Sequence, residues 1–205
     1  MGLRIRLVEP RPAGHNVYDR ALLPRLGLPL MAKMLAESGH DVRIYCEILA
    51  PVDLDDLLGA NLVGISSTTA TAPAAYRLAD LLGTAGVPVV LGGPHVSFCA
   101  DEALGHAHYV VRGEGEQTIC ELVACLEEGR PLEEVRGLSF RAGDGESHHN
   151  PARPARPSCC APWLLRTSRR YGPRKSVPMP PGARCLARRS TMSSSPSCAS
   201  RAARW

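Results

Sequence analysis

Short apolar segments alternate with amphipathic ones through the first 129 residues of the chain. Apolar runs of about five residues, rich in Val, Ile and Leu, are typical of strands buried on both faces of a parallel sheet. The pattern predicts five such strands, at Leu3–Val8, Asp41–Tyr45, Leu62–Ser66, Val87–Leu91 and His108–Arg112.

The amphipathic segments between these strands predict helices. The helices are expected at residues 28–39, Leu54–Leu58, Ala72–Thr84 and Gln117–Glu127, with a short irregular or helical piece around Ala100–Gly105. In the first helix, we expect Leu30, Met34 and Leu35 on one face. Strands that alternate with helices predict right-handed βαβ units, so the expected fold class is α/β, a doubly wound parallel sheet. Two later segments, Leu138–Arg141 and Ser147–His149, are separated by a Gly-Asp-Gly turn and predict a hairpin.

The segment Val87–His95 (VPVVLGGPH) combines a predicted strand with two glycines, a proline and a histidine directly after it. A glycine pair at the carboxyl end of a strand has no Cβ atoms, so a bulky ligand can lie against the backbone there. A tight turn without a ligand explains the same residues equally well when this stretch is taken alone.

Composition divides the chain into two unlike parts. Residues 1–150 contain 12 basic and 20 acidic residues, a formal charge of −8, whereas residues 151–205 contain 12 basic residues and no acidic ones, a charge of +12. The second part also holds 9 of the 18 prolines. We therefore predict a globular domain at 1–150 and a disordered basic tail, rich in Pro, Ser and Arg, at 151–205.

Several classes of protein are disfavoured by the sequence. No apolar run is long enough to span a bilayer, and no signal peptide is evident. Four cysteines, Cys46, Cys99, Cys120 and Cys125, occur singly, which indicates reduced thiols and a cytoplasmic location. The cysteine spacings match neither a zinc site nor an iron–sulfur site, so no metal ligand is predicted. A role for the tail as a nucleic-acid arm is disfavoured because its three aromatic residues show no periodicity.

Four segments are expected to meet at the carboxyl edge of the sheet, where open α/β sheets bind ligands. They are the Pro-rich loop after the first strand, Ser66–Thr71, Gly92–His95 and Gly113–Glu116. The second segment contains more hydroxyl side chains than capping of a helix requires. These hydroxyls could form hydrogen bonds to the polar edge of a ligand. The predicted binding residues are Ser66, Ser67, Thr68, Thr69, Gly92, Gly93, Pro94, His95, Gly113 and Glu114.

Structural explanations also exist for parts of this site. One or two of the hydroxyls can serve as helix caps, and Glu114 can simply stabilise a helix N-terminus. The G-x-G-x-x-G loop of a nicotinamide-binding domain is missing after the first strand.

The order of these motifs resembles the cobalamin-binding domain that precedes the barrel of cobalamin-dependent radical S-adenosylmethionine enzymes. The resemblance rests on LGLPLMAKMLAESGHDV, VGISSTT, VVLGGPHVSF and YVVRGEGEQT, is extended by GLSFRAGDGE, and covers roughly residues 3 to 150. It implies a flavodoxin-like (Rossmann-like) fold and a cobalamin whose nucleotide tail and lower face lie against Ser66–Thr69 and Gly92–His95. On that reading, Gly93→Leu is expected to abolish cobalamin retention and leave the fold intact.

Two departures from the family pattern limit what the resemblance implies. The Asp-x-His-x-x-Gly motif that supplies a lower cobalt ligand in mutases is absent, because His15 has neither the Asp nor the Gly at the required spacing. The implied cobalamin is therefore bound without a histidine ligand.

The second departure concerns the radical barrel. The C-x-x-x-C-x-x-C segment that holds an iron–sulfur cluster is also missing. The sequence thus predicts a module that is not catalytic alone, with no iron–sulfur cluster in this chain and a radical domain encoded separately or lost. The composition change near Pro157 suggests the hypothesis of a shifted reading frame beyond that point. The alternatives are a flavin- or phosphate-binding flavodoxin-like module, or a fragment without function.

Overall fold

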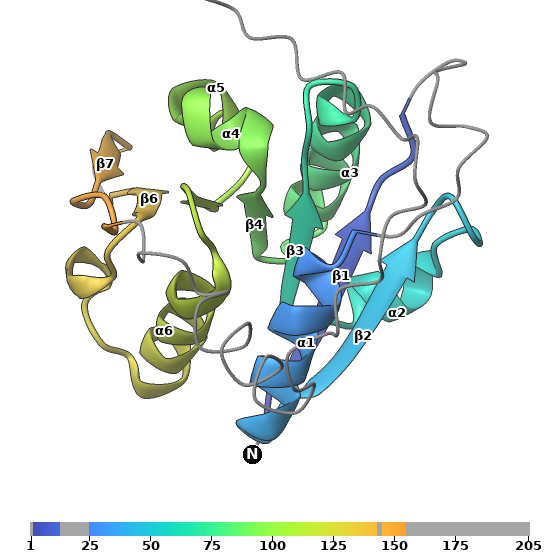
Figure 1. Cartoon of the computed structure of the whole chain (residues 1–205), viewed down its shortest axis with the longest axis horizontal. Helices are drawn as coiled ribbons and strands as arrows, with labels where there is room; N and C mark the ends of the chain where they lie inside the picture. The colour runs from blue at the N-terminus through green and yellow to red at the C-terminus, as the bar shows by residue number, and fades with distance from the viewer. Residues whose placement is uncertain (1, 13–24, 143–144, 155–205) are drawn as a thin grey trace, which may run out of the picture. The chain divides into compact units, whose positions relative to one another are not determined.

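A seven-stranded sheet lies at the centre of the described part of the chain (Figure 1). The computed structural model describes residues 2–12, 25–142 and 145–154; His15 and residues 155–205 of the predicted tail lie outside these residues. The strands follow the order β2-β1-β3-β4-β5-β6-β7. Their bounds are β1 Arg4–Glu9, β2 Asp41–Cys46, β3 Leu62–Ser66, β4 Val89–Gly92, β5 Tyr109–Val111, β6 Leu138–Arg141 and β7 Ser147–His149.

The first five strands are parallel, and β6 and β7 continue the sheet as an antiparallel hairpin. The order of the parallel strands, with β1 between β2 and β3, is that of the flavodoxin-like doubly wound sheet. The predicted fold class is confirmed. The order of the strands in the sheet reverses between β1 and β3, which places the ligand-binding edge expected for such folds at the carboxyl ends of these two strands.

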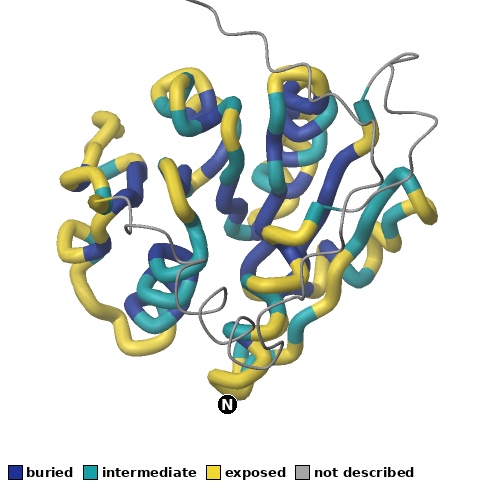
Figure 2. The backbone as a smooth tube through the Cα atoms, viewed as in Figure 1, coloured by how far each residue is buried: buried dark blue, intermediate teal, exposed yellow. Residues whose placement is uncertain are grey.

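Helices cover both faces of the sheet. Their bounds are α1 Gly27–Glu37, α2 Leu54–Leu58, α3 Ala72–Thr84, α4 Pro94–Phe98, α5 Ala100–Leu104 and α6 Glu116–Glu128, followed by a 3-10 turn at Leu132–Glu134. Helices α1 and α6 pack with one face of the strands to form one buried cluster, and α2 to α5 form a second cluster with the other face. Figure 2 shows the central strands as the most deeply buried part, while β7 is exposed.

Two local predictions were wrong. The buried face of α1 consists of Leu28 and Leu35 with the half-buried Met31 and Ala32, whereas Leu30 is 48% exposed. The spacing of the buried residues, i, i+3, i+4 and i+7, is that of an amphipathic helix, and Leu30 falls outside it.

The second difference concerns the segment around β4. This strand begins two residues later than expected, because Pro88 has no N–H to donate to the sheet. The segment after Gly93 is a short helix rather than a turn, with Pro94 in its first turn, where a proline is well tolerated.

A buried ion pair ties β1 to β2 and α2. The guanidinium of Arg6, a residue only 1% exposed, donates from Nη2 to Asp41 at 2.9 Å and from Nε to Asp56 at 2.5 Å. Hydrogen bonds from Arg6 and then from the hydroxyl of Tyr45 lower the pKa of Asp56 to about 2. The pair therefore keeps a charge buried inside the sheet satisfied.

None of the helices within residues 2–12, 25–142 and 145–154 has both the length and the apolar content that crossing a membrane requires.

Candidate functional site

A cavity of about 370 Å³ opens between the sheet and helices α1 and α6, at the carboxyl ends of the strands. Strand residues that point to this face alternate along the chain, as the pleat of a sheet requires. They comprise Leu7 of β1, Gly64 and Ser66 of β3, Val90 and Gly92 of β4, and Val111 of β5; Ile65 of β3 also borders the cavity. The register pairs Gly64 with both Leu7 and Val90, so these residues form one continuous floor.

Two glycines in neighbouring strands line the cavity, and only one of them leaves open space at its Cβ position. A Cβ atom added to Gly64 would lie 2.8 Å from Cδ2 of Leu7, so the floor of the cavity is closed there. A Cβ atom added to Gly92 would have its nearest neighbour, Cβ of Val111, at 4.0 Å. Glycine in a strand weakens that strand, and its presence is typical of a close approach by a ligand or another backbone.

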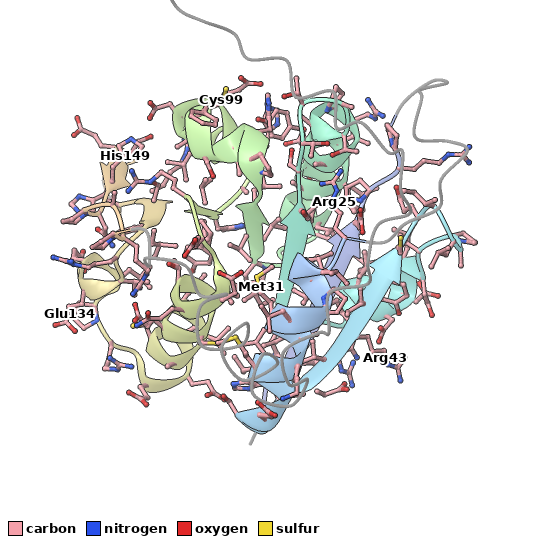
Figure 3. The ribbon with its side chains drawn as sticks, in the orientation of Figure 1. Arg25, Met31, Arg43, Cys99, Glu134 and His149 are labelled. Carbon is pink, nitrogen blue, oxygen red and sulfur yellow. The ribbon has the colours of Figure 1, made fainter. Side chains whose placement is uncertain are left out.

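Apolar side chains of the helices form the opposite wall of the cavity. Leu28 and Met31 line it from α1, and Ile119 lines it from α6. Figure 3 labels Met31 on α1 and Arg25 on the segment that leads into this helix. The cavity is thus a mostly apolar slot with polar groups at its rim, as small-molecule sites usually are.

Arg25 is the only arginine or lysine among the described residues that line the cavity. Its Nε lies 3.2 Å from Oε1 of Glu9, and its Nη2 donates to the hydroxyl of Thr68 at 3.2 Å. The backbone N–H of Arg25 also donates to Glu9, whose side chain is 4% exposed. The remaining nitrogen, Nη1, is buried and has no hydrogen-bond partner among the described residues.

Arg25 is not among the binding residues predicted from the sequence. The signal that was available is Glu9, an acidic residue at the end of an otherwise buried strand. A carboxylate in that position needs a cation or several hydrogen bonds. The partner lies 16 positions away, beyond a loop whose course the sequence does not reveal.

The predicted hydroxyl cluster divides between the cavity and the protein interior. Ser66 and Thr68 line the cavity, whereas Thr69 is exposed and does not line it. Ser67 is fully buried; its N–H donates to the carbonyl of Gly92 at 2.7 Å. Thr71 accepts a hydrogen bond from the N–H of Thr68 at 2.9 Å and makes no side-chain cap to α3. Two of the five hydroxyl residues of this segment therefore line the cavity, while Ser67 and Thr71 hold the loop and Thr69 is exposed.

Gly93 has a structural role that the sequence did not reveal. Its φ is +105°, and a Cβ atom there would lie 2.4 Å from the carbonyl oxygen of Ser67. Because backbone atoms cannot move aside cheaply, the prediction that Gly93→Leu leaves the fold intact was wrong. Gly92, whose Cβ position is open, is the glycine at which a side chain would enter the cavity.

A single hydroxyl connects the loops after β4 and β5. Ser97 donates to the carbonyl of Gly93 at 2.9 Å and accepts from the N–H of Gly113, also at 2.9 Å. Gly93, Pro94 and Gly113 line the cavity, but the exposed Glu114 does not. The three predicted loops after β3, β4 and β5 are thus joined by direct hydrogen bonds.

His95 points away from the cavity. It lies on α4, with Nδ1 at 3.4 Å from the hydroxyl of Thr69 and its ring centroid 6.0 Å from that of Tyr76 on α3. Burial, and then the negative charges of Glu102 and Cys99, raise the pKa of Tyr76 to about 12. The participation of His95, Ser67, Thr69 and Glu114 in ligand binding stays a prediction.

The sequence of the chain is similar to those of known proteins. The B12 binding domain family matches residues 19–123 of the chain. An uncharacterized methyltransferase of Pyrococcus horikoshii is 36% identical over 142 residues, which cover 64% of this chain and 30% of that protein. The anaerobic magnesium-protoporphyrin IX monomethyl ester cyclase of Rubrivivax gelatinosus is 35% identical over 167 residues, which cover 74% of this chain and 30% of the cyclase.

The fold is also similar to a solved structure, that of the cobalamin-dependent S-adenosylmethionine radical enzyme OxsB with aqua-cobalamin and S-adenosylmethionine bound. The two share a TM-score of 0.63 and 20% identity over 74% of this chain and 22% of OxsB, which is a likeness of fold. The chain spans less than a third of the length of these relatives. The matches confirm the resemblance that the sequence motifs indicated.

Proposed function

The chain belongs to the B12 binding domain family, and from that premise we propose that it binds cobalamin with the nucleotide tail in the cavity between the sheet and helices α1 and α6. The observation that carries the proposal is the slot formed over Gly64 and Gly92. The tail ends in a flat aromatic base, which suits apolar walls and a glycine floor. When bound, cobalamin supplies a cobalt centre that can carry a methyl group or an electron.

Arg25 supports the placement of the tail. The nucleotide of cobalamin contains a phosphodiester, and a guanidinium is well suited to bind phosphate oxygens. Glu9 and Thr68 hold two sides of this guanidinium, while Nη1 remains buried and unpaired among the residues that the structure describes. Arg25 would therefore donate a hydrogen bond from Nη1 to the phosphate. The hydroxyls of Ser66 and Thr68 would form hydrogen bonds with amide groups of the corrin.

No histidine among the described residues lines the cavity, so we expect cobalamin to be bound without a histidine ligand to cobalt. His95 does not line the cavity, since its side chain faces Thr69 and Tyr76. The loops after β3 and β4 would hold the lower face of the cofactor. The module would hold the cofactor for a radical S-adenosylmethionine domain, and catalysis would need that domain. A cytoplasmic location, predicted from the single cysteines, fits this role.

The test is retention of cobalamin by the full chain. The protein is mixed with hydroxocobalamin, desalted, and examined for corrinoid absorbance, with flavin mononucleotide treated in parallel. We expect stoichiometric corrinoid and no flavin. A colourless protein, or one that retains flavin instead, would overturn the proposal in favour of the flavodoxin-like alternative or a fragment without function.

A second arm of the test addresses Arg25. Removing one charged hydrogen bond costs about 1.5–3 kcal/mol, which is about a 10- to 100-fold rise in Kd. The double variant Glu9→Gln, Arg25→Gln removes both charges of the buried pair, so the fold is not left with an unpaired carboxylate. Arg130→Gln, a change at an exposed residue just after the end of α6, is the matched control and should bind as the unchanged protein does.

A further inference from the structure

Three potential metal ligands meet where α4 turns into α5. One ring nitrogen of His95, the sulfur of Cys99 and a carboxylate oxygen of Glu102 all lie within 4.8 Å of one another. Figure 3 labels Cys99 at this corner. The backbone holds the three residues together, because the N–H of Cys99 donates to the carbonyl of His95 at 3.2 Å and the N–H of Ala103 donates to that of Cys99 at 3.0 Å.

We propose that His95, Cys99 and Glu102 bind a divalent transition-metal ion of the Zn²⁺ class, with water in the fourth position. Imidazole, thiolate and carboxylate are the usual protein ligands of such ions. Bond lengths of about 2.0–2.3 Å place tetrahedral ligand atoms about 3.3–3.8 Å apart. The side chain of Glu102 is exposed, so a small rotation would bring the three ligand atoms to that separation.

Two polar atoms beside the cluster support a bound ion. Nε2 of His95 and the hydroxyl of Tyr76 are buried, and neither has a hydrogen-bond partner among the described residues. Thr69 lies 3.4 Å from the other ring nitrogen, Nδ1, and so orients the imidazole with Nε2 toward the interior. An ion and its bound water would satisfy both atoms, which buried polar groups normally require.

The site is separate from the proposed cobalamin cavity. The cavity lies on the face of the sheet covered by α1 and α6, whereas α4 and α5 pack with α3 on the other face. None of the three ligands lines the cavity. The ion would brace the loop after β4, whose residues Gly92 to Pro94 do line it. Because the two sites share no residue, binding of metal can be measured in the absence of cobalamin.

The experiment uses Co²⁺ as a spectroscopic substitute for Zn²⁺. The full chain carries further cysteines at positions 159, 160, 185 and 198, so the reference protein has these four replaced by serine. We expect one Co²⁺ per chain, tetrahedral visible bands and a thiolate-to-cobalt charge-transfer band in the near ultraviolet, all abolished by one equivalent of Zn²⁺. Cobalamin is left out, because it absorbs in the same region.

Variants of the ligands decide the outcome. Cys99→Ser should lose the charge-transfer band, and Glu102→Gln should weaken Co²⁺ binding by at least the 10- to 100-fold that is typical for loss of a group supporting a metal ligand. The matched controls are Cys120→Ser on α6 and Glu133→Gln, which lie outside the cluster and should bind as the reference does. Circular dichroism of each variant verifies the fold. Absence of Co²⁺ binding, a band that survives in Cys99→Ser, or equal affinity of Glu102→Gln would overturn the site.

Discussion

Replacing Gly92 with valine should abolish cobalamin binding and leave the protein folded. The residue lies at the end of β4 on the face that lines the cavity, with no atom nearer to its Cβ position than 4.0 Å. Valine is well suited to a strand, whereas glycine in a strand costs about 0.5–1 kcal/mol relative to alanine. We therefore expect the free energy of unfolding to stay equal or to rise by up to about 1 kcal/mol.

The loss of affinity follows from the space that valine takes. An aromatic base the size of a tyrosine or phenylalanine ring buries about 150 Å². At about 25 cal/mol per Å², displacing it from the cavity costs about 4 kcal/mol. That energy corresponds to about a 1000-fold rise in Kd, and Gly92→Ala, which adds one carbon, should cost far less.

The assay combines equilibrium binding of hydroxocobalamin, followed by absorbance, with urea denaturation of each variant. Gly93→Ala is the informative contrast, because its added Cβ would lie 2.4 Å from a carbonyl oxygen in a backbone conformation that L-residues rarely adopt. That variant should lose stability by more than about 2 kcal/mol. If Gly92→Val binds cobalamin as tightly as the unchanged protein, the cavity does not hold the tail. If Gly93→Ala is as stable as the unchanged protein, the described packing of the two loops is wrong.

Three further outcomes test the packing that positions the site. Leu122→Ala on α6, at a side chain that is 0% exposed, should lower the free energy of unfolding by about 2–5 kcal/mol in urea denaturation, and a loss below about 1 kcal/mol would contradict its place in the core. Asp56 has a pKa of about 2 in the folded protein, below the usual value near 3.9. Its pairing with Arg6 therefore stabilises the fold by about 2 kcal/mol above about pH 4, and this contribution is lost as the pH falls to about 2. In Asp56→Asn that part of the pH dependence should be missing from acid denaturation curves, and an unchanged acid slope would refute the assignment. Ser97→Ala removes the hydroxyl that joins the loop after β4 to Gly113. This variant should weaken cobalamin binding by up to about 10-fold, with little effect on urea denaturation. Unchanged affinity would show that the hydrogen bonds of Ser97 do not organise the site.

Much of the fold could be predicted because its signals are local. The strands at residues 62–66 and 138–141 and the helix at Ala72–Thr84 have the predicted bounds. An apolar run limited by turn residues specifies a buried strand without knowledge of its neighbours. The prediction for α1 was wrong in placing Leu30 on the buried face of the helix. Leu30 and Leu28 are equally hydrophobic, and only the position of the sheet decides which of them is buried.

The candidate site was predictable as a set of loops but not as a set of contacts. The sequence by itself determined the order of strands and helices along the chain. That order places the loops after β3, β4 and β5 at one edge of a parallel sheet. Both features depend only on short-range patterns and on chain connectivity. Only the tertiary structure decided that Gly92 opens a cavity while Gly93 packs against Ser67, and that Arg25 pairs with the buried Glu9. Gly93 lies just beyond β4, where its φ of +105° brings it against the backbone of Ser67 from another loop. Contacts of this kind depend on how distant segments pack, so neither distinction is written in the local sequence.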